Sequence, residues 1–192
     1  MKKIRLLMIL LLCSASSALL AAETYVIDTK GMHASINFQI PHLGYSLLTG
    51  RFNRFSGSFV YDRDNPSASS VSVVIETASV DSNHAERDKH LRGDEFLHAD
   101  KFPEATFVSS SFKVDGSAFA VMEGVLTLRG VSKPLMIRLK KIGEGEDPWG
   151  GYRMGFAGET SFLLADFGIL KELGPHSKSV MLQMNIEGVR EE

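Results

Sequence analysis

Residues 33–40 read HASINFQI, a stretch in which polar and apolar side chains alternate without a break. Successive side chains of an extended chain point to opposite faces. Ala34, Ile36, Phe38 and Ile40 would therefore share one face, and the polar residues would share the other. The stretch predicts a β-strand with one face buried and one face in water.

The same alternation returns along most of the chain and decides the fold class. It predicts strands over residues 24–27, 33–40, 49–61, 70–76, 105–113, 118–129, 135–140, 154–162 and 180–187. The apolar parity slips between Phe52 and Phe55, which indicates a bend or bulge near Asn53. Turns are expected at residues 62–66, 115–116 and 130, and a loop at 143–151. About eight strands joined mostly by short turns favour an all-β, antiparallel sandwich or barrel.

The first 22 residues are typical of a secretory signal peptide. A basic start (residues 2–5) precedes an apolar run (6–12), and small residues close the segment at Ala21-Ala22. A membrane anchor is the rival interpretation, but the apolar run is short and serines follow it. We expect removal of residues 1–22, a single domain over 23–192 and export to the periplasm. The only cysteine, Cys13, would leave with the signal, so the core must be stable without a disulfide.

Charge argues against two classes of partner. The chain has 21 basic and 23 acidic residues, and loss of the signal would leave 18 basic ones. No basic cluster follows a nucleic-acid backbone, so a nucleic-acid partner is not expected. No second apolar stretch is long enough to span a bilayer, so the mature chain is not expected to be an integral membrane protein. Transient membrane contact and a homodimer stay open.

One segment, residues 81–103, interrupts the strands. Asn83 followed by Glu86 resembles a helix capping box, and Gly93 is a suitable helix stop. Opposite charges four residues apart, Glu86 with His90 and Asp88 with Arg92, favour a short solvated helix between them. The apolar residues of this crossover must be buried, and we expect them at the open end of the barrel or beside it; they are Phe96, Leu97 and Phe102.

Several motifs, taken in order, carry a specific resemblance. The crossover contains NHAERDKHLR (83–92), EFL (95–97) and FPEATF (102–107). SINFQIPHLG (35–44) precedes them, and GVLTLRGVSKP (124–134), DPWGG (147–151) and DFGI (166–169) follow. Together they resemble the YceI-like family of periplasmic polyisoprenoid-binding proteins across essentially the whole mature chain. The resemblance implies an elongated lipocalin-like barrel with a long apolar lumen. It also implies a bound isoprenoid quinone, its precursor or a similar long-chain amphiphile, with no catalysis and no other cofactor.

The alternating stripes and the crossover then give candidate site residues. An eight-stranded barrel is just wide enough to be filled by side chains or to admit one small ligand. We expect the lumen to be lined by apolar residues of these segments: Ile36, Phe38, Ile40, Phe52, Phe59, Val73, Ile75, Phe96, Leu97, Phe102, Phe107, Leu126, Leu128, Ile137, Phe156, Phe162 and Met184. A polar head group would need partners at the mouth. The candidates are His42, Tyr45, His84, Arg87 and His90.

Two other functions compete with a lipid carrier. His84, Asp88 and His90 could form an enzyme site acting on a lipid head group. No metal site is expected there, because two histidines six residues apart do not share a helix face neatly and no third ligand has a matching spacing. The other competitor is a structural or stress protein whose barrel is solid, since apolar stripes also describe an ordinary core.

Overall fold

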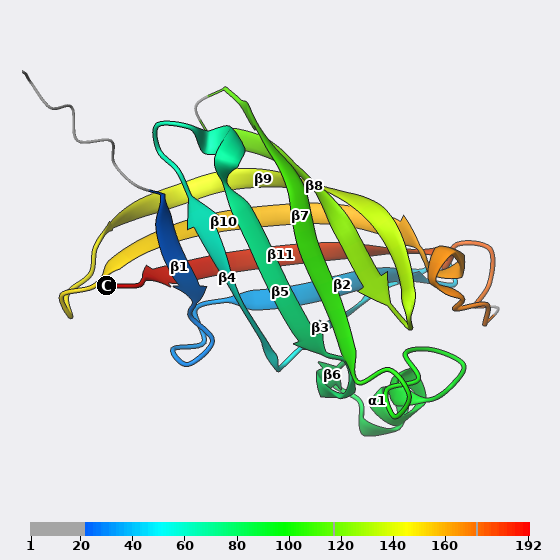
Figure 1. The fold of residues 1–192 in the computed structure, drawn as a ribbon. Helices are drawn as coiled ribbons and strands as arrows, with labels where there is room; N and C mark the ends of the chain where they lie inside the picture. Colours follow the sequence, from blue (N-terminus) through cyan, green and yellow to red (C-terminus); the bar gives the residue numbers. More distant parts are fainter. Residues whose placement is uncertain (1–21, 117, 172) are drawn as a thin grey trace, which may run out of the picture.

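A computed structural model describes residues 22–116, 118–171 and 173–192, and shows one closed antiparallel β-barrel with a short helix at one end (Figure 1). The predicted signal peptide, apart from Ala22, lies outside the described residues. Within the described part, none of the helices is both long and apolar enough to cross a membrane. The all-β antiparallel class predicted from the alternation is confirmed, and so is the barrel that the family resemblance implied.

The strands follow one another around the barrel. They are β1 (Glu23–Ile27), β2 (Ser35–His42), β3 (Ser46–Phe52), β4 (Phe55–Tyr61), β5 (Ser70–Glu76), β6 (Val80–Asp81), β7 (Glu104–Asp115), β8 (Phe119–Leu128), β9 (Val131–Glu146), β10 (Tyr152–Leu163) and β11 (Ser179–Arg190). The helix α1 (Ala85–Arg92) lies between β6 and β7. Three 3-10 turns are η1 (Pro66–Ala68), η2 (Thr77–Ser79) and η3 (Leu164–Phe167).

Eight positions close the ring, because three of them hold two consecutive strands. β11 pairs with β1 near its end, through Gly188, and with β2 further back, through residues 181–185. β1 and β2 thus follow one another along the same edge of β11. On their other side they pair with β4 and β3, and β4 and β3 in turn pair with β5 and β6. The pairing of β1 with β11 closes the ring, and among the described residues an open edge is left where β3 runs past β6, because β3 pairs with β6 through Arg51 and Phe52 alone.

The bend predicted near Asn53 is confirmed. β3 ends at Phe52 and β4 begins at Phe55. The backbone N–H of Asn53 donates to the carbonyl oxygen of Ser79 (3.0 Å), and that of Arg54 donates to the Ser79 hydroxyl (3.0 Å). Ser79 belongs to η2, which interrupts the neighbouring strand, so two adjacent strands break together and keep their amides bonded.

The loop predicted over residues 143–151 is confirmed for residues 147–151 and wrong for residues 143–146. β9 continues to Glu146, and only residues 147–151 form the turn before β10. Glycine and acidic residues are poor strand formers, but pairing with β10 overrides that preference. Glu144 also accepts a bond from Arg63 across the barrel end (2.7 Å). The turn at Arg129-Gly130 is as expected, with φ of 52° and 74°, the left-handed pair that suits a tight hairpin.

The helix lies where it was predicted, but its cap and side-chain pairs differ. The N-cap is His84, whose Nδ1 accepts from the Arg87 amide (3.2 Å), and not Asn83. Asp88 is buried and accepts from the Ser82 amide (2.7 Å), while His90 bonds Glu95. Partners outside the helix thus replace those predicted four residues away. The helix ends before Gly93 as expected, although that glycine has φ of −69°.

Large side chains fill the half of the barrel nearest β1. Tyr25 stacks on Phe59 (ring centroids 4.9 Å apart), and Phe156 packs edge-on against Phe59 (5.7 Å). The inward position on β11 opposite these rings is Gly188, where an added Cβ would lie 2.5 Å from the Phe59 ring. The absence of a side chain there lets the rings cross the interior.

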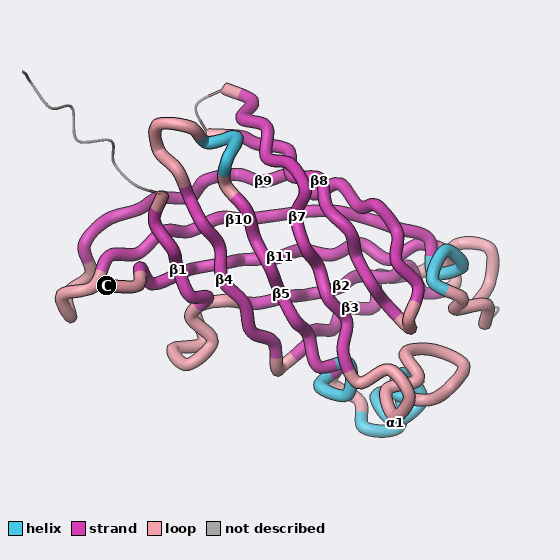
Figure 2. The backbone as a smooth tube through the Cα atoms, in the orientation of Figure 1, coloured by secondary structure: helices cyan, strands magenta, loops and turns pink. Residues whose placement is uncertain are grey.

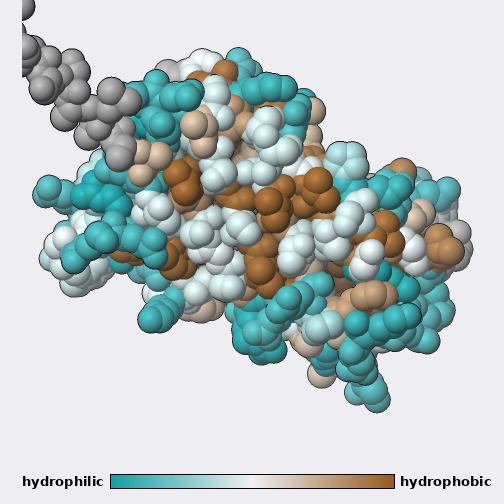
Figure 3. Space-filling view, viewed as in Figure 1, coloured by the Kyte–Doolittle hydropathy of each residue, from teal (hydrophilic) through white to brown (hydrophobic). Residues whose placement is uncertain are grey.

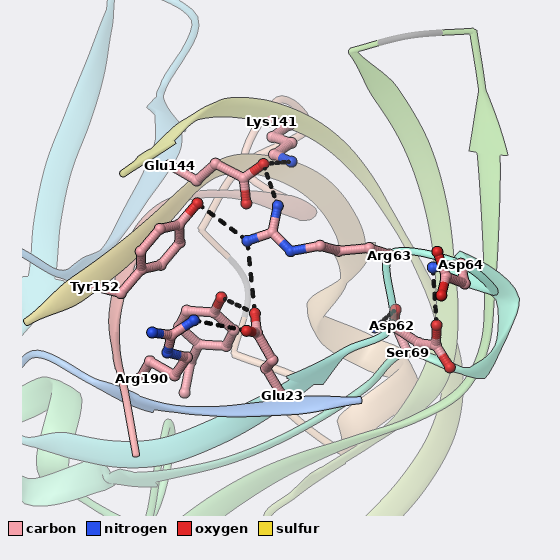
Figure 4. Close-up of polar contacts among 10 residues, drawn as sticks. Glu23, Asp62, Arg63, Asp64, Ser69, Lys141, Glu144, Tyr152 and Arg190 are labelled. Atoms are coloured by element: carbon pink, nitrogen blue, oxygen red, sulfur yellow. Dashed lines mark hydrogen bonds and ion pairs between the residues drawn. The ribbon is translucent and has the colours of Figure 1, made fainter. Parts of the chain in front are cut away.

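A network of charged residues covers the end of this filled half. Figure 4 shows Arg63 reaching Glu144, Tyr152 (3.1 Å) and Glu23 (3.5 Å) from the loop after β4. Glu23 also accepts from Arg190 of β11 (2.6 Å). The network joins the first and last strands with β9 and β10. The outer surface over β4, β5 and β7 mixes pale and polar side chains with small apolar patches (Figure 3).

Candidate functional site

The opposite half of the barrel is hollow. It holds a partly open cavity of about 530 Å³ whose wall comes from eight strands: β2, β3, β5, β6, β7, β8, β10 and β11. Two segments border it: the crossover containing α1 and the β10–β11 connection containing η3. In Figure 2, α1 lies below the lower ends of β5 and β7, and the β10–β11 connection lies at the right-hand ends of β10 and β11. Cavities of a few hundred cubic ångströms with apolar walls are typical of small-molecule sites.

Nine of the seventeen predicted lumen residues line this cavity. They are Phe38, Ile40, Phe52, Ile75, Phe96, Leu97, Leu126, Leu128 and Phe162. Of the strands from which lumen residues were predicted, β4 and β9 contribute nothing to the wall, and β7 and β11 contribute only residues that were not predicted. Their proximity to a ligand stays a prediction, since only the geometry of the wall is established.

The remaining eight do not line this cavity, and their contact with a ligand also stays a prediction. Ile36, Phe59, Val73, Phe107, Ile137, Phe156 and Met184 belong to the filled half. Phe102 packs at the β8–β9 turn, where its ring lies 2.9 Å from an added Cβ on Gly130. Parity determines which face of a strand a residue occupies but not its level along the barrel axis, so it could not separate the hollow half from the filled one.

The wall also contains apolar residues that the sequence analysis missed. Val180 and Leu182 share the parity of Met184 and could have been chosen from that pattern. Ile169 and Leu173 lie in the irregular β10–β11 connection, and Leu43 in the β2–β3 turn. Residues of irregular segments have no periodicity that would reveal their burial.

Three of the five head-group candidates border the cavity, namely His42, Arg87 and His90. Tyr45 lies in the β2–β3 turn and is 87% exposed. His84 lies at a separate, polar surface hollow together with Asp88. Tyr45 and His84 therefore do not border the apolar cavity. The proposed enzyme set is divided between two sites, with His90 at the cavity and His84 and Asp88 at the surface hollow.

Arg87 places a positive charge at the wall and holds it in a fixed position. Its Nε donates to the Ser82 hydroxyl (2.7 Å) and one terminal nitrogen donates to the Ser82 carbonyl oxygen (2.6 Å). Asp88 binds the amide of the same serine, so residue 82 anchors the first turn of α1. A fixed guanidinium beside apolar walls can orient a polar or anionic group of a ligand.

His90 and Glu95 connect the two segments that cover the cavity. His90 Nε2 lies 2.9 Å from Glu95, and its ring packs edge-on against Phe96. Glu95 also accepts from Lys171 of the β10–β11 connection (2.5 Å). The hydrogen bond from His90, followed by that from Lys171, lowers the pKa of Glu95 below its usual value. Arg129 holds the crossover from the other side through the carbonyl oxygens of Asp94 and Phe96.

A second cluster of titratable residues lies at the far end of the barrel. Ligand atoms of Asp28, His33 and Glu187 come within 4.8 Å of one another, as metal ligands would. Arg153 already bonds two of them, at 2.7 Å from Asp28 and 2.6 Å from Glu187, and its Nε bonds Asp147 (2.6 Å). The hydrogen bond from Arg153, followed by that from the Gly31 amide, lowers the pKa of Asp28 to about 2. The guanidinium occupies the place and supplies the charge that a metal ion would, so the cluster is an ion-pair network.

A closed eight-stranded barrel with one helical crossover and an apolar end cavity agrees with the family suggested by the sequence motifs. The model of the YceI-like domain matches residues 25–188. The chain belongs to the YceI-like family. UPF0312 proteins of Shewanella sp. strain W3-18-1 and of Shewanella oneidensis are both 56% identical to it over 170 residues, which cover 88% of this chain and 89% of each relative.

Solved structures of this YceI-like fold agree with the arrangement. The YceI protein of Campylobacter jejuni is 28% identical, with a TM-score of 0.71, over 80% of this chain and 91% of that one. BcnA of Burkholderia cenocepacia has a TM-score of 0.74 at 18% identity, over 84% and 98% of the two chains. A polyisoprenoid-binding domain from Saccharophagus degradans has a TM-score of 0.64 at 16% identity, over 87% and 98%. The last two similarities establish the fold alone.

Proposed function

We propose that this YceI-like protein is a periplasmic carrier that holds a polyisoprenoid, such as a quinone, a quinone precursor or a similar long-chain amphiphile. The observation that carries the proposal is the hollow end of an otherwise filled barrel. Stability alone would favour side chains there, because close packing lowers the free energy of the folded state. A cavity of about 530 Å³ with an almost wholly apolar wall is suited to a hydrocarbon.

The physical chemistry of the wall supports a thin apolar tail as ligand. Each methylene-sized group moved from water into such a cavity contributes roughly 0.8 kcal/mol. A tail of a few isoprene units would therefore bind without a single hydrogen bond. The name of the Saccharophagus degradans neighbour, a polyisoprenoid-binding domain of the same fold, agrees with this ligand class.

The head group would lie near α1. Arg87, His90 and His42 are the charged or titratable side chains that border the cavity, and Ser177 adds a hydroxyl. The Ser177 hydroxyl donates to the Pro41 carbonyl oxygen (2.5 Å) and so joins the end of β2 to the β10–β11 connection. A phenol, quinone or acid placed there could accept a hydrogen bond from Arg87 or His90 while its tail extends toward β5 and β7.

The test is to express the full chain, recover it from the periplasmic fraction and analyse its organic extract by mass spectrometry. We expect a co-purifying hydrocarbon-rich molecule in stoichiometric amount. A Leu126→Trp variant, which fills the cavity, should lose the molecule, whereas Val125→Trp on the outer face of the same strand should keep it. Equal recovery from both variants, or none from the native protein, would contradict the carrier function. Recovery from the cytoplasm alone would contradict the periplasmic location.

A further inference from the structure

The hollow half ends abruptly at one level of side chains. Phe38 of β2 is paired with Leu182 of β11, and both side chains line the cavity. Two residues further along each strand, on the same face, Ile36 is paired with Met184 and neither lines it. The cavity therefore ends between two successive inward-facing layers.

The opposite wall ends in the same way. Ile75 is paired with Ala105, and both line the cavity. The next inward pair, Val73 with Phe107, does not. On all four strands the cavity thus ends at the same layer of side chains. This layer separates the hollow half from the filled half, and we call it the floor; its members are Ile36, Val73, Phe107 and Met184.

Two glycines allow side chains to close this floor. Phe107 covers Gly124, where an added Cβ would lie 2.4 Å from its ring. Met184 covers Gly158, where an added Cβ would lie 3.3 Å from the methionine methyl and 3.0 Å from Leu139. Gly158 is paired with Met184 on one side and with Leu139 on the other. Met184 therefore extends across β10 toward β9 over a position that has no side chain.

Met184 is the least enclosed member of this layer. Ile36, Val73 and Phe107 are buried, whereas Met184 is only partly buried. Methionine is unbranched and flexible, so it can close an irregular gap and can also be displaced from it. The branched and aromatic side chains around it are stiffer.

We propose that Met184 is the specificity-determining residue of the cavity and sets the longest tail that the protein accepts. The inference rests on the proposed carrier function, because it assigns the depth limit of that same site. A tail entering near α1 gains contacts until it reaches Met184 and gains none beyond it. Shortening this side chain extends the cavity into the volume that the methionine vacates beside Leu139 and Ile137 and moves the limit toward longer tails.

The experiment measures dissociation constants for the series geraniol, farnesol and geranylgeraniol by competition with a fluorescent fatty acid. The native protein should show affinity that rises with chain length and then levels off. Each further buried methylene-sized group is worth about fourfold in affinity. Met184→Ala should move the plateau to a longer prenol. Met184→Leu, which keeps most of the volume, should leave the plateau where the native protein has it.

Met154→Ala is the matched control, because Met154 is fully buried in the filled half and does not line the cavity. It removes the same atoms, so a general loosening of the barrel would appear in both alanine variants. A plateau that stays in place in Met184→Ala, or moves equally in Met154→Ala, overturns the inference.

A ligand-independent measurement separates this inference from the carrier function. In xenon-pressurised crystals of Met184→Ala, xenon continuous with the main cavity supports the floor assignment, and an isolated pocket overturns it. If the native protein binds none of the prenols, the carrier proposal for this ligand class fails, and the xenon result still decides whether Met184 closes the cavity.

Discussion

Two alanines on the inner face of the barrel provide a direct test of whether one half is hollow. Ala105 on β7 and Ala120 on β8 are both buried, at 5% and 8% exposure, but only Ala105 lines the cavity. Replacing each by leucine adds the same three carbons. In Ala105→Leu these atoms enter open apolar space, whereas in Ala120→Leu they enter a packed core.

The magnitudes follow from the two environments. Three added methylene-sized groups can contribute up to about 2.4 kcal/mol when buried without a clash. We expect Ala105→Leu to leave the free energy of unfolding unchanged or to raise it within that bound. Overpacking usually costs about 1–3 kcal/mol, so Ala120→Leu should lower it by that amount. The added side chain at 105 also displaces ligand contacts of similar size, which corresponds to about 50-fold weaker binding of a long prenol.

Urea denaturation of the ligand-free proteins gives the stabilities, and competition binding gives the affinities. The decisive result is an opposite effect of the two substitutions. Ala105→Leu should lose affinity but not stability, and Ala120→Leu should lose stability but keep most of its affinity. Equal destabilisation by both substitutions would refute the hollow half. A stable Ala105→Leu protein with native affinity would mean that the ligand does not occupy the cavity near β7.

Three further predictions concern the cover, the ion-pair cluster and the filled half. Lys171→Ala removes the bond to Glu95 that joins the two covering segments, so stopped-flow release of a fluorescent fatty acid should become several-fold faster; an unchanged release rate would show that these segments do not control exit. Asp28→Asn should reduce the loss in the free energy of unfolding that the native protein shows as the pH falls from 4 toward 2. The depressed pKa of Asp28, about 2 against an ordinary 3.8, contributes on the order of 2 kcal/mol above pH 4, and this contribution is lost as the pH falls toward 2. A native-like loss of stability over that interval in Asp28→Asn would contradict the assignment. Gly188→Ala places a methyl group 2.5 Å from the Phe59 ring and should lower the free energy of unfolding by about 1–3 kcal/mol in urea, without changing the plateau of prenol affinity.

Alternation along a strand predicted which residues face the interior of the barrel but not which of them border the cavity. Phe38 and Ile36 belong to one apolar stripe, and both were expected to face the interior, as they do. Only one of them borders the cavity. Their difference arises from what faces them across the barrel, including the glycines at 124 and 158 that let other side chains close the floor. Such contacts join residues far apart in the chain, so no local pattern contains them.

For the polar head-group candidates too, local sequence did not determine which residues border the cavity. The crossover was expected to supply His84, Arg87 and His90 to one mouth. The helix has 3.6 residues per turn, so His84 and His90, six residues apart, do not share a face, and the docking of α1 decided that Arg87 and His90 border the cavity while His84 does not. The choice of His84 over Asn83 as the cap followed from the backbone of residue 83, which has φ of 62°, and a capping-box motif does not specify that geometry.

The sequence by itself determined the all-β antiparallel class, the place of the helix and the inward or outward face of most strand residues, because alternation and short turns are local properties of the chain. The choice of a barrel over a sandwich came from motifs that resemble the YceI-like family. The tertiary structure decided that only one end of the barrel is hollow, which residues close it and which charges border it. These features depend on the level at which strands pair and on the volumes that meet across the interior, and both are set only when the ring closes.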